Sequence, residues 1–210
     1  MRKHIGWIAG TAAAALVAAG AITYAVAEDG GGGGGLSVPS ADGADAGFAR
    51  DMAVHHQQAV EMSYLVRDRT KNAEVRRLAY DIAQTQANQR GMLLGWLDLW
   101  DLPKVSAKPP MSWMGMGDMP ERGDGSLMPG MATDTELKKL GTLNGKQAEI
   151  FYLQLMTDHH KGGIHMAEGC VARCTVAVEK SLAQGMVDAQ QSELTAMKQM
   201  LTERGARPRD

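Results

Sequence analysis

One pattern of eleven residues occurs twice in this chain, and no other feature of the sequence limits its fold so strongly. The first copy runs from Met52 to Met62 and the second from Met156 to Met166. Both copies read Met-x-x-His-His-x-x-small-β-branched-x-Met, and the equivalent positions lie 104 residues apart. A pattern that returns with its internal spacing intact predicts two halves of a chain that fold alike.

Each copy lies in a segment with helical periodicity. Apolar residues and histidines recur at steps of three and four, and the sequence has no strand pattern. We predict long helices over about residues 45–69, 73–100, 146–168 and 176–204, and a short one from the capping-box residues Thr133 and Glu136 to about Leu140. The offset also pairs Leu78 with Leu182, Ala79 with Ala183, Ile82 with Met186, Gln86 with Gln190 and Leu93 with Met197. These observations predict an all-α, ferritin-like four-helix bundle of two repeated hairpins, joined by a long crossover over residues 103–132.

The N-terminal part of the chain carries signals for export rather than for folding. Arg2 and Lys3 precede an uncharged, apolar run over residues 5–27, and Glu28 and Asp29 follow it. This order of charges predicts a signal peptide over residues 1–27, or a membrane anchor if the segment is not cleaved, and an extracytoplasmic location for the rest. A run of glycines predicts a flexible linker over residues 28–43, so the folded domain should occupy residues 44–205.

The repeated pattern places soft metal ligands on one face of each helix. At about 100° per residue, the methionines and histidines of one copy point in similar directions. Imidazole suits copper and zinc, whereas thioether sulfur selects soft ions, above all Cu(I). We therefore predict that the chain binds Cu(I), or Ag(I) as its chemical mimic, where the two copies converge. The predicted ligands are Met52, His55, His56, Met62, Met156, His159, His160 and Met166.

Six of the 15 methionines lie in the predicted crossover. We expect this segment to be exposed and flexible, because it is rich in proline and glycine and has no periodicity. Its thioethers then predict a secondary site for the same ion, with simple disorder of a low-complexity segment as the alternative. The methionines are Met111, Met114, Met116, Met119, Met128 and Met131.

Two cysteines follow the second copy, four residues apart. In an exported protein, Cys170 and Cys174 predict a disulfide at the turn between the third and fourth long helices. Such a bond requires the helix to end or distort there, because side chains at this spacing in a regular helix are poorly aimed at each other. The alternative is that Cys170 adds a soft ligand to the metal site.

Several classes of function are excluded by what the chain lacks. A formal net charge of −2 and 5% aromatic residues give no basis for nucleic-acid binding. A di-iron enzyme would need Glu-x-x-His on two helices, and this spacing does not occur. Glu61, Glu168 and His165 lie off the ligand face. Motifs of nucleophilic or phosphate chemistry are absent too, so we predict a binding protein and not an enzyme.

Two other interpretations of the histidines stay open. In the first, the histidines form a buried polar network that fixes the register of a non-metal structural or interaction module. In the second, the chain is a copper-dependent oxidase, which would need an open coordination position.

These motifs resemble those of the domain-of-unknown-function 305 family. The similarity rests on the two His-His motifs, on Met128-Pro129-Gly130-Met131 and on the segment Thr133-Asp134-x-Glu136-Leu137, and it covers roughly residues 48–201. The resemblance implies an exported, ferritin-like, four-helical domain, and it suggests a role in the binding or tolerance of copper or silver. The cysteine pair and the glycine run are not part of the resemblance.

Overall fold

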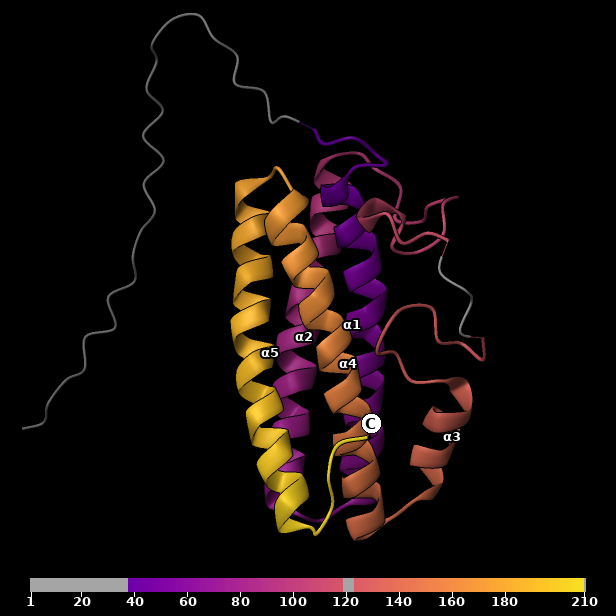
Figure 1. Cartoon of the computed structure of the whole chain (residues 1–210), viewed down its shortest axis with the longest axis vertical. Helices are drawn as coiled ribbons and strands as arrows, with labels where there is room; N and C mark the ends of the chain where they lie inside the picture. The colour runs from indigo at the N-terminus through magenta and orange to yellow at the C-terminus, as the bar shows by residue number, and fades with distance from the viewer. Residues whose placement is uncertain (1–37, 119–122, 210) are drawn as a thin grey trace, which may run out of the picture. The chain divides into compact units, whose positions relative to one another are not determined.

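Four long helices form two hairpins that lie side by side (Figure 1). The first hairpin consists of α1 (Ala44–Arg69) and α2 (Ala73–Leu99), and the second of α4 (Gly145–Arg173) and α5 (Ala177–Glu203). Between them lie a 3-10 turn, η1 (Ser112–Met114), and the short helix α3 (Asp134–Thr142).

The structure is a computed structural model that describes residues 38–118 and 123–209, and these contain no strand. The prediction of an all-α chain is therefore confirmed for the described residues, while the specific likeness to ferritin stays a prediction. The expected signal or anchor over residues 1–27 lies outside them, as does most of the linker.

Local sequence explains where several helices begin and end. The side chain of Asn72 accepts hydrogen bonds from the backbone N–H groups of Glu74 and Val75, which caps α2. Both bonds of the capping box between Thr133 and Glu136 are present at the start of α3. Helix α4 runs to Arg173 and not to about residue 168, so the predicted end was too early.

α1 packs against both α2 and α4. Contacts at its two ends show that α1 and α4 run antiparallel. At one end of α1, Asp45 accepts hydrogen bonds from the backbone N–H groups of Thr175 and Val176, at 2.7 and 2.8 Å. At the other end, the Thr70 hydroxyl donates to Glu149, near the start of α4, at 2.5 Å. Glu149 also pairs with Arg204 at the end of α5, at 2.7 Å. The start of α1 therefore lies beside the end of α4, and its end beside the start of α4.

The apolar core is divided into two clusters along the bundle. One cluster surrounds the start of α1 and the end of α4, and the other surrounds their opposite ends. The first contains Phe48, Met52, Leu93, Leu97, Met166 and Met186. The second contains Met62, Ile82, Leu155, Met156, Met197 and Leu201.

The crossover packs onto the first cluster, which contradicts our expectation that its methionines would be exposed. Asp51 of α1 accepts hydrogen bonds from the Met111 backbone N–H at 2.7 Å and from Trp113 Nε1 at 2.9 Å. This docking buries three thioethers almost completely. They belong to Met111, Met128 and Met131, whereas Met114 and Met116 are partly buried and Met119 lies outside the described residues.

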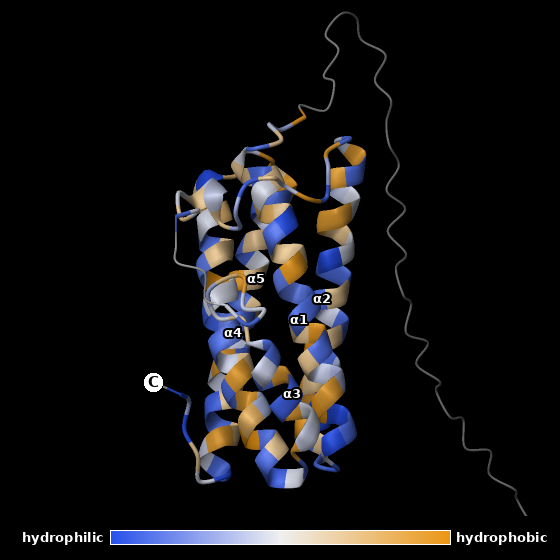
Figure 2. Ribbon diagram, turned by 90° about the vertical axis from the view of Figure 1, so that its right-hand side faces the viewer, coloured by the Kyte–Doolittle hydropathy of each residue, from blue (hydrophilic) through white to orange (hydrophobic). Residues whose placement is uncertain are grey.

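No helix that the structure describes is both long enough and apolar enough to cross a bilayer. Hydrophilic and hydrophobic residues alternate along each of the long helices (Figure 2). This alternation is typical of helices that bury one face against their neighbours and turn the other to water.

Candidate metal centre

Four imidazoles meet between the two core clusters, near the middle of α1 and α4. The rings of His55 and His159 face each other across the helix contact, with centroids 3.7 Å apart and planes inclined by 32°. His56 and His160 flank this pair, at 6.5 and 6.4 Å from the adjacent ring on their own helices. All four side chains are fully buried. The two copies of the repeated motif thus lie against each other, as the sequence predicts.

Hydrogen bonds at Nε2 decide which nitrogen of three rings carries the proton. His159 Nε2 donates to the backbone carbonyl of His55 at 3.0 Å, because a carbonyl oxygen can only accept. His160 Nε2 donates to the Glu193 carboxylate at 2.6 Å, and His56 Nε2 to the Gln89 amide oxygen at 2.8 Å. Each of these rings carries a proton on Nε2. In the neutral rings of His56 and His159, Nδ1 therefore keeps a free lone pair.

None of the four Nδ1 atoms has a hydrogen-bond partner, although all are buried. Buried polar atoms are normally paired, so four unpaired Nδ1 atoms in one cluster require an explanation. A metal-binding histidine commonly donates its second ring N–H to a carboxylate or a carbonyl, which orients the ring and leaves the other nitrogen for the ion. The four imidazoles therefore form a donor set that fits a metal ion.

Three of the imidazoles, those of His55, His56 and His159, are held in their neutral form. Burial lowers the pKa of His55 to about 3, with a further lowering by His56 and His160. Burial likewise lowers the pKa of His56 to about 3, and it lowers that of His159 well below its usual value. Metal ligands must be unprotonated, so these rings need not release a proton to bind a cation near neutral pH.

The partners of the outer histidines repeat the internal symmetry of the chain. Gln89 of α2 and Glu193 of α5 are separated by 193 − 89 = 104 residues, the offset of the repeated motif. Neither residue was among the predicted site residues, because one position carries an amide and the other a carboxylate. Applying the offset to every polar position of the second and fourth long helices would have found the pair.

A second pair at the same offset, Gln86 and Gln190, is buried nearby. The Oε1 atom of each amide has no hydrogen-bond partner. A Cβ atom at Gly163 would lie 2.5 Å from Gln190 Oε1, so this glycine leaves room for the amide side chain. The glutamines therefore add two more unpaired oxygens close to the helix contact.

The four motif methionines are divided between the two core clusters, which lie on either side of the histidines. Met52 and Met166 lie in the first core cluster, and Met62 and Met156 lie in the second. The reason is the direction of the helices. Since α1 and α4 run antiparallel, the first methionine of one copy lies near the last methionine of the other. All four are fully buried.

The spacing of the His, Cys, Asp and Glu side chains limits the number of imidazoles that can bind one ion. Among the described residues, the one group of at least three His, Cys, Asp or Glu side chains with ligand atoms within 4.8 Å of one another is Cys170, Cys174 and Glu179. No three imidazoles come so close together. An ion at the histidines would thus be held by fewer imidazoles, with thioether sulfur as the other nearby donor type.

The crossover covers the histidines from one side. Gly162 of α4 and Gly130 of the crossover pack backbone against backbone, and a Cβ atom on either would overlap main-chain atoms. Gly130 has a φ of +83°, a conformation that side chains other than glycine rarely adopt. The Pro129 carbonyl lies close enough to His55 to raise the pKa of that ring, but burial lowers the pKa by more. The segment Met128–Met131 therefore lies between the imidazoles and solvent.

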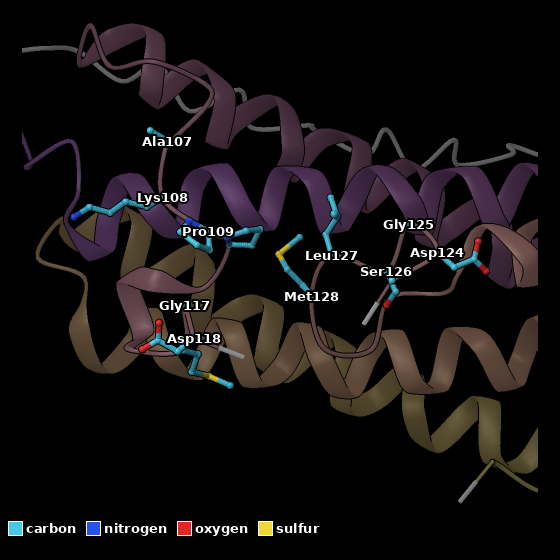
Figure 3. Close-up of a pocket in the computed structure, with 13 residues that line it drawn as sticks. Ala107, Lys108, Pro109, Gly117, Asp118, Asp124, Gly125, Ser126, Leu127 and Met128 are labelled. Carbon is cyan, nitrogen blue, oxygen red and sulfur yellow. The ribbon is translucent and has the colours of Figure 1, made fainter. Parts of the chain in front are cut away.

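A cavity of about 800 Å³ lies within the crossover and not at the histidines (Figure 3). Its lining includes Lys108, Asp118 and two of the crossover methionines, Met116 and Met128. The four imidazoles contribute nothing to it, so the candidate metal centre is a packed part of the core and not an open pocket.

The cysteine pair forms a disulfide, Cys170–Cys174, with Cα atoms 4.8 Å apart. Helix α4 ends at Arg173, and the backbone of Cys174 is extended, with φ −63° and ψ 150°. This change of direction at the end of the helix lets the two side chains meet. Neither sulfur is then free to act as a thiolate ligand for the histidine cluster.

Together these features define an all-α protein in which two similar hairpins enclose a buried cluster of four imidazoles. The family model of the domain of unknown function DUF305 matches residues 45–201. The chain belongs to the DUF305 family.

Solved structures of the same fold support this assignment. A DUF305 protein from Streptomyces coelicolor, presumed to be secreted, is 71% identical, with 81% of this chain and 99% of that chain covered and a TM-score of 0.76. A DUF305 fragment from Deinococcus radiodurans is 28% identical, with 76% and 96% covered and a TM-score of 0.64. CopM in its Cu(I)-bound form is 20% identical, with 76% and 96% covered and a TM-score of 0.58, a similarity that concerns the fold alone. The comparison with curated proteins finds no significant match.

Proposed function

We propose that this chain binds a soft metal ion, Cu(I) or Ag(I), through its paired His-His/Met motifs. The observation that carries the proposal is the set of four buried Nδ1 atoms without a partner. Three of the four rings are already oriented through Nε2, as the rings of metal sites are. An ion at Nδ1 would use lone pairs that otherwise remain unpaired in the core.

The choice of a soft ion rests on the type of donors. The carboxylates of Glu61 and Glu168 are exposed, and the exposed His165 also lies away from the cluster. Oxygen donors near the helix contact are the Glu193 carboxylate, which already accepts from His160, and the amide oxygens of Gln86 and Gln190. The repeated motif itself offers imidazole nitrogen and thioether sulfur, which favour Cu(I) over harder ions. CopM, which shares the fold, has been solved in Cu(I)-bound, Cu(II)-bound and Ag-bound forms, and this supports copper or silver as the ion here.

We further propose that the domain acts outside the cytoplasm, in the handling or tolerance of copper. The order of charges around residues 5–27 predicts export. The similar protein from Streptomyces coelicolor, presumed to be secreted, supports this location. We propose binding and not catalysis, because fully buried imidazoles leave no access for a substrate larger than an ion.

The experiment is a titration of the purified domain with Cu(I) against a competing chelator. The tested variant replaces His55 and His159 by glutamine, and the matched control is His165→Gln, which changes an exposed histidine on the same helix as His159. We expect the double variant to lose tight uptake and the control to keep it. X-ray absorption of the loaded wild-type protein should then show nitrogen and sulfur scatterers around copper.

Thermal unfolding of each variant separates loss of ligands from loss of fold. If the double variant takes up Cu(I) as tightly as the wild type, the proposal is wrong. If the wild-type domain takes up neither Cu(I) nor Ag(I) and the replacements only lower the melting temperature, the histidines form a structural polar network instead.

A further inference from the structure

A buried carboxyl group lies beside the disulfide and has no role in the metal centre described above. Glu179, in the first turn of α5, has an exposed fraction of 0%, no N–H or hydroxyl group donates to its oxygens, and its carboxyl group shares a hydrogen bond with that of Asp45. Burial, followed by the Asp45 charge and this hydrogen bond, raises the pKa of Glu179 to about 9. Two carboxyl groups buried side by side are costly to a folded protein. The presence of Glu179 at this position therefore needs a reason other than stability.

The neighbouring acidic group does not need Glu179. Asp45 accepts hydrogen bonds from the backbone N–H groups of Thr175 and Val176 and from the Thr175 hydroxyl, the last at 3.1 Å. Asp45 thus holds the turn between α4 and α5 by itself. Glu179 adds a second carboxyl group close to that of Asp45. The turn between α4 and α5 does not require this second group.

The position of Glu179 relative to the sulfurs suggests an explanation. One carboxylate oxygen of Glu179 and the Sγ atoms of Cys170 and Cys174 all lie within 4.8 Å of one another. Once reduction breaks the S–S bond, the two sulfurs can move apart and bind one ion together with this oxygen, because zinc–sulfur bonds are about 2.3 Å long and zinc–oxygen bonds about 2.0–2.2 Å. While the disulfide is intact, the sulfurs are not thiolates and cannot act as such ligands.

We propose that Cys170, Cys174 and Glu179 form a second metal site, for a divalent ion of the zinc type, which exists only when the disulfide is reduced. Two thiolates and a carboxylate are ligands that zinc prefers, and three protein ligands are the number found in zinc sites with an open position. The site shares no residue with the imidazole cluster and does not depend on the function proposed for it.

The charge of the ligands selects a divalent ion over Cu(I). Two thiolates and the Glu179 carboxylate carry three negative charges, and the Asp45 carboxylate lies next to them. In a buried position such an excess of negative charge is unfavourable unless a cation balances it. A divalent ion balances more of that charge than a monovalent one does. The oxidised protein, by contrast, has no thiolate charge at this place.

The change between the two forms is a two-electron reduction. A phosphine reductant attacks one sulfur and breaks the S–S bond, and water then converts the phosphine to its oxide. The disulfide gains two electrons from phosphorus and two protons from water, which gives the thiols of Cys170 and Cys174. Near neutral pH, binding of the divalent ion then releases the thiol protons and also the carboxyl proton of Glu179, because the pKa of that group is raised to about 9.

The test compares zinc binding by the reduced and oxidised forms of the same chain. The protein is reduced with a water-soluble phosphine, freed of reductant without air, checked for two free thiols, and titrated with Zn²⁺ against a chromophoric chelator. The imidazole cluster is present in both forms, so its contribution cancels in the difference. We expect one additional zinc ion per reduced chain. Co²⁺ as a spectroscopic probe should give a sulfur-to-cobalt charge-transfer band in the reduced form only.

Variants identify the ligands. We expect Glu179→Gln to weaken zinc binding by the reduced chain roughly 10–100-fold, the range known for partners that support metal sites. The matched control Glu168→Gln, an exposed position on α4, should leave it unchanged. The double variant C170S/C174S should bind no more zinc under reducing conditions than the oxidised wild type binds.

Two results would overturn the proposal: equal zinc binding by the reduced and oxidised forms, or wild-type affinity in the reduced Glu179→Gln variant. If the buried disulfide resists the phosphine, the chain is reduced in denaturant and refolded without air in the presence of Zn²⁺. A refolded, reduced chain that retains no more zinc than C170S/C174S treated in the same way would also overturn it.

Discussion

Replacing Gly162 by alanine tests whether the crossover is held against α4 as closely as the structure indicates. Gly162 lies in the interior of α4, where alanine would ordinarily stabilise the helix by about 0.5–1 kcal/mol. Gly185 of α5 is the matched control, since a Cβ atom there would have no neighbour within 4 Å. Gly185→Ala should therefore show the helix gain alone.

At position 162 the added methyl group meets the main chain of the crossover. Its carbon would lie 2.8 Å from the carbonyl carbon of Pro129, whereas ordinary contacts begin at 3.4 Å, so the two must separate by at least 3.4 − 2.8 = 0.6 Å. The crossover cannot move freely, because Gln58 binds the backbone of Ala132 through two hydrogen bonds of 2.9 and 2.7 Å. Overpacking of this kind costs about 1–3 kcal/mol.

We therefore expect Gly162→Ala to be less stable than Gly185→Ala by about 1–3 kcal/mol, the cost of overpacking. For a domain of this size that difference lowers the melting temperature by roughly 2–12 °C. Differential scanning calorimetry and urea unfolding of the two variants and the wild type measure it. Equal melting temperatures for the two variants, or a higher one for Gly162→Ala, would refute the close contact between Gly162 and the crossover.

Three further predictions concern stability. Burial lowers the pKa of His55 and of His56 to about 3. As the pH falls from about 6.5 towards 3, the unfolded chain therefore takes up protons before the folded one. The free energy of unfolding should drop by up to about 1.4 kcal/mol per pH unit for each ring. Urea titrations between pH 7 and 4 measure this, and a flat profile would count against burial of neutral rings. Arg204→Met leaves the buried charge of Glu149 without its cationic partner and should lower the free energy of unfolding by about 3–5 kcal/mol, measured with a chemical denaturant. A decrease of less than about 1 kcal/mol would contradict a buried ion pair at this position. Thr133→Ala removes the capping box of α3 and should cost about 1 kcal/mol, which hydrogen exchange in α3 would detect; unchanged exchange there would be the contrary result.

The helices could be predicted from the sequence because each carries its own periodic pattern. The end of α4 could not, since nothing before Cys174 breaks the helical pattern, and the helix continues until the backbone of that residue becomes extended. The burial of Met111 and Met128 was also out of reach. It results from the docking of a non-periodic segment onto Asp51 of α1, which lies about 60 residues earlier in the chain.

The candidate site, like the fold, could be predicted from the sequence only in part. The repeat predicts that His55 and His159 meet, and they do. It does not state whether the helices run parallel or antiparallel, and this direction decides on which side of the rings each methionine lies. Gln89 and Glu193 could not be predicted as partners of the histidines. They lie on the second helix of each hairpin, and the sequence does not indicate what a polar residue on a helix contacts.

The antiparallel contact between α1 and α4 also has a consequence for the order in which the chain folds. α1 and α2 join through a turn of three residues, so the first hairpin can form from local contacts alone. Its ligand face, however, is covered by a helix whose equivalent residues follow 104 positions later. At about 5–20 residues per second, the ribosome needs roughly 5–20 s to supply them. During that interval His55, Met52 and Met62 face solvent, so the newly made chain exposes thioethers and imidazoles that the finished protein buries completely.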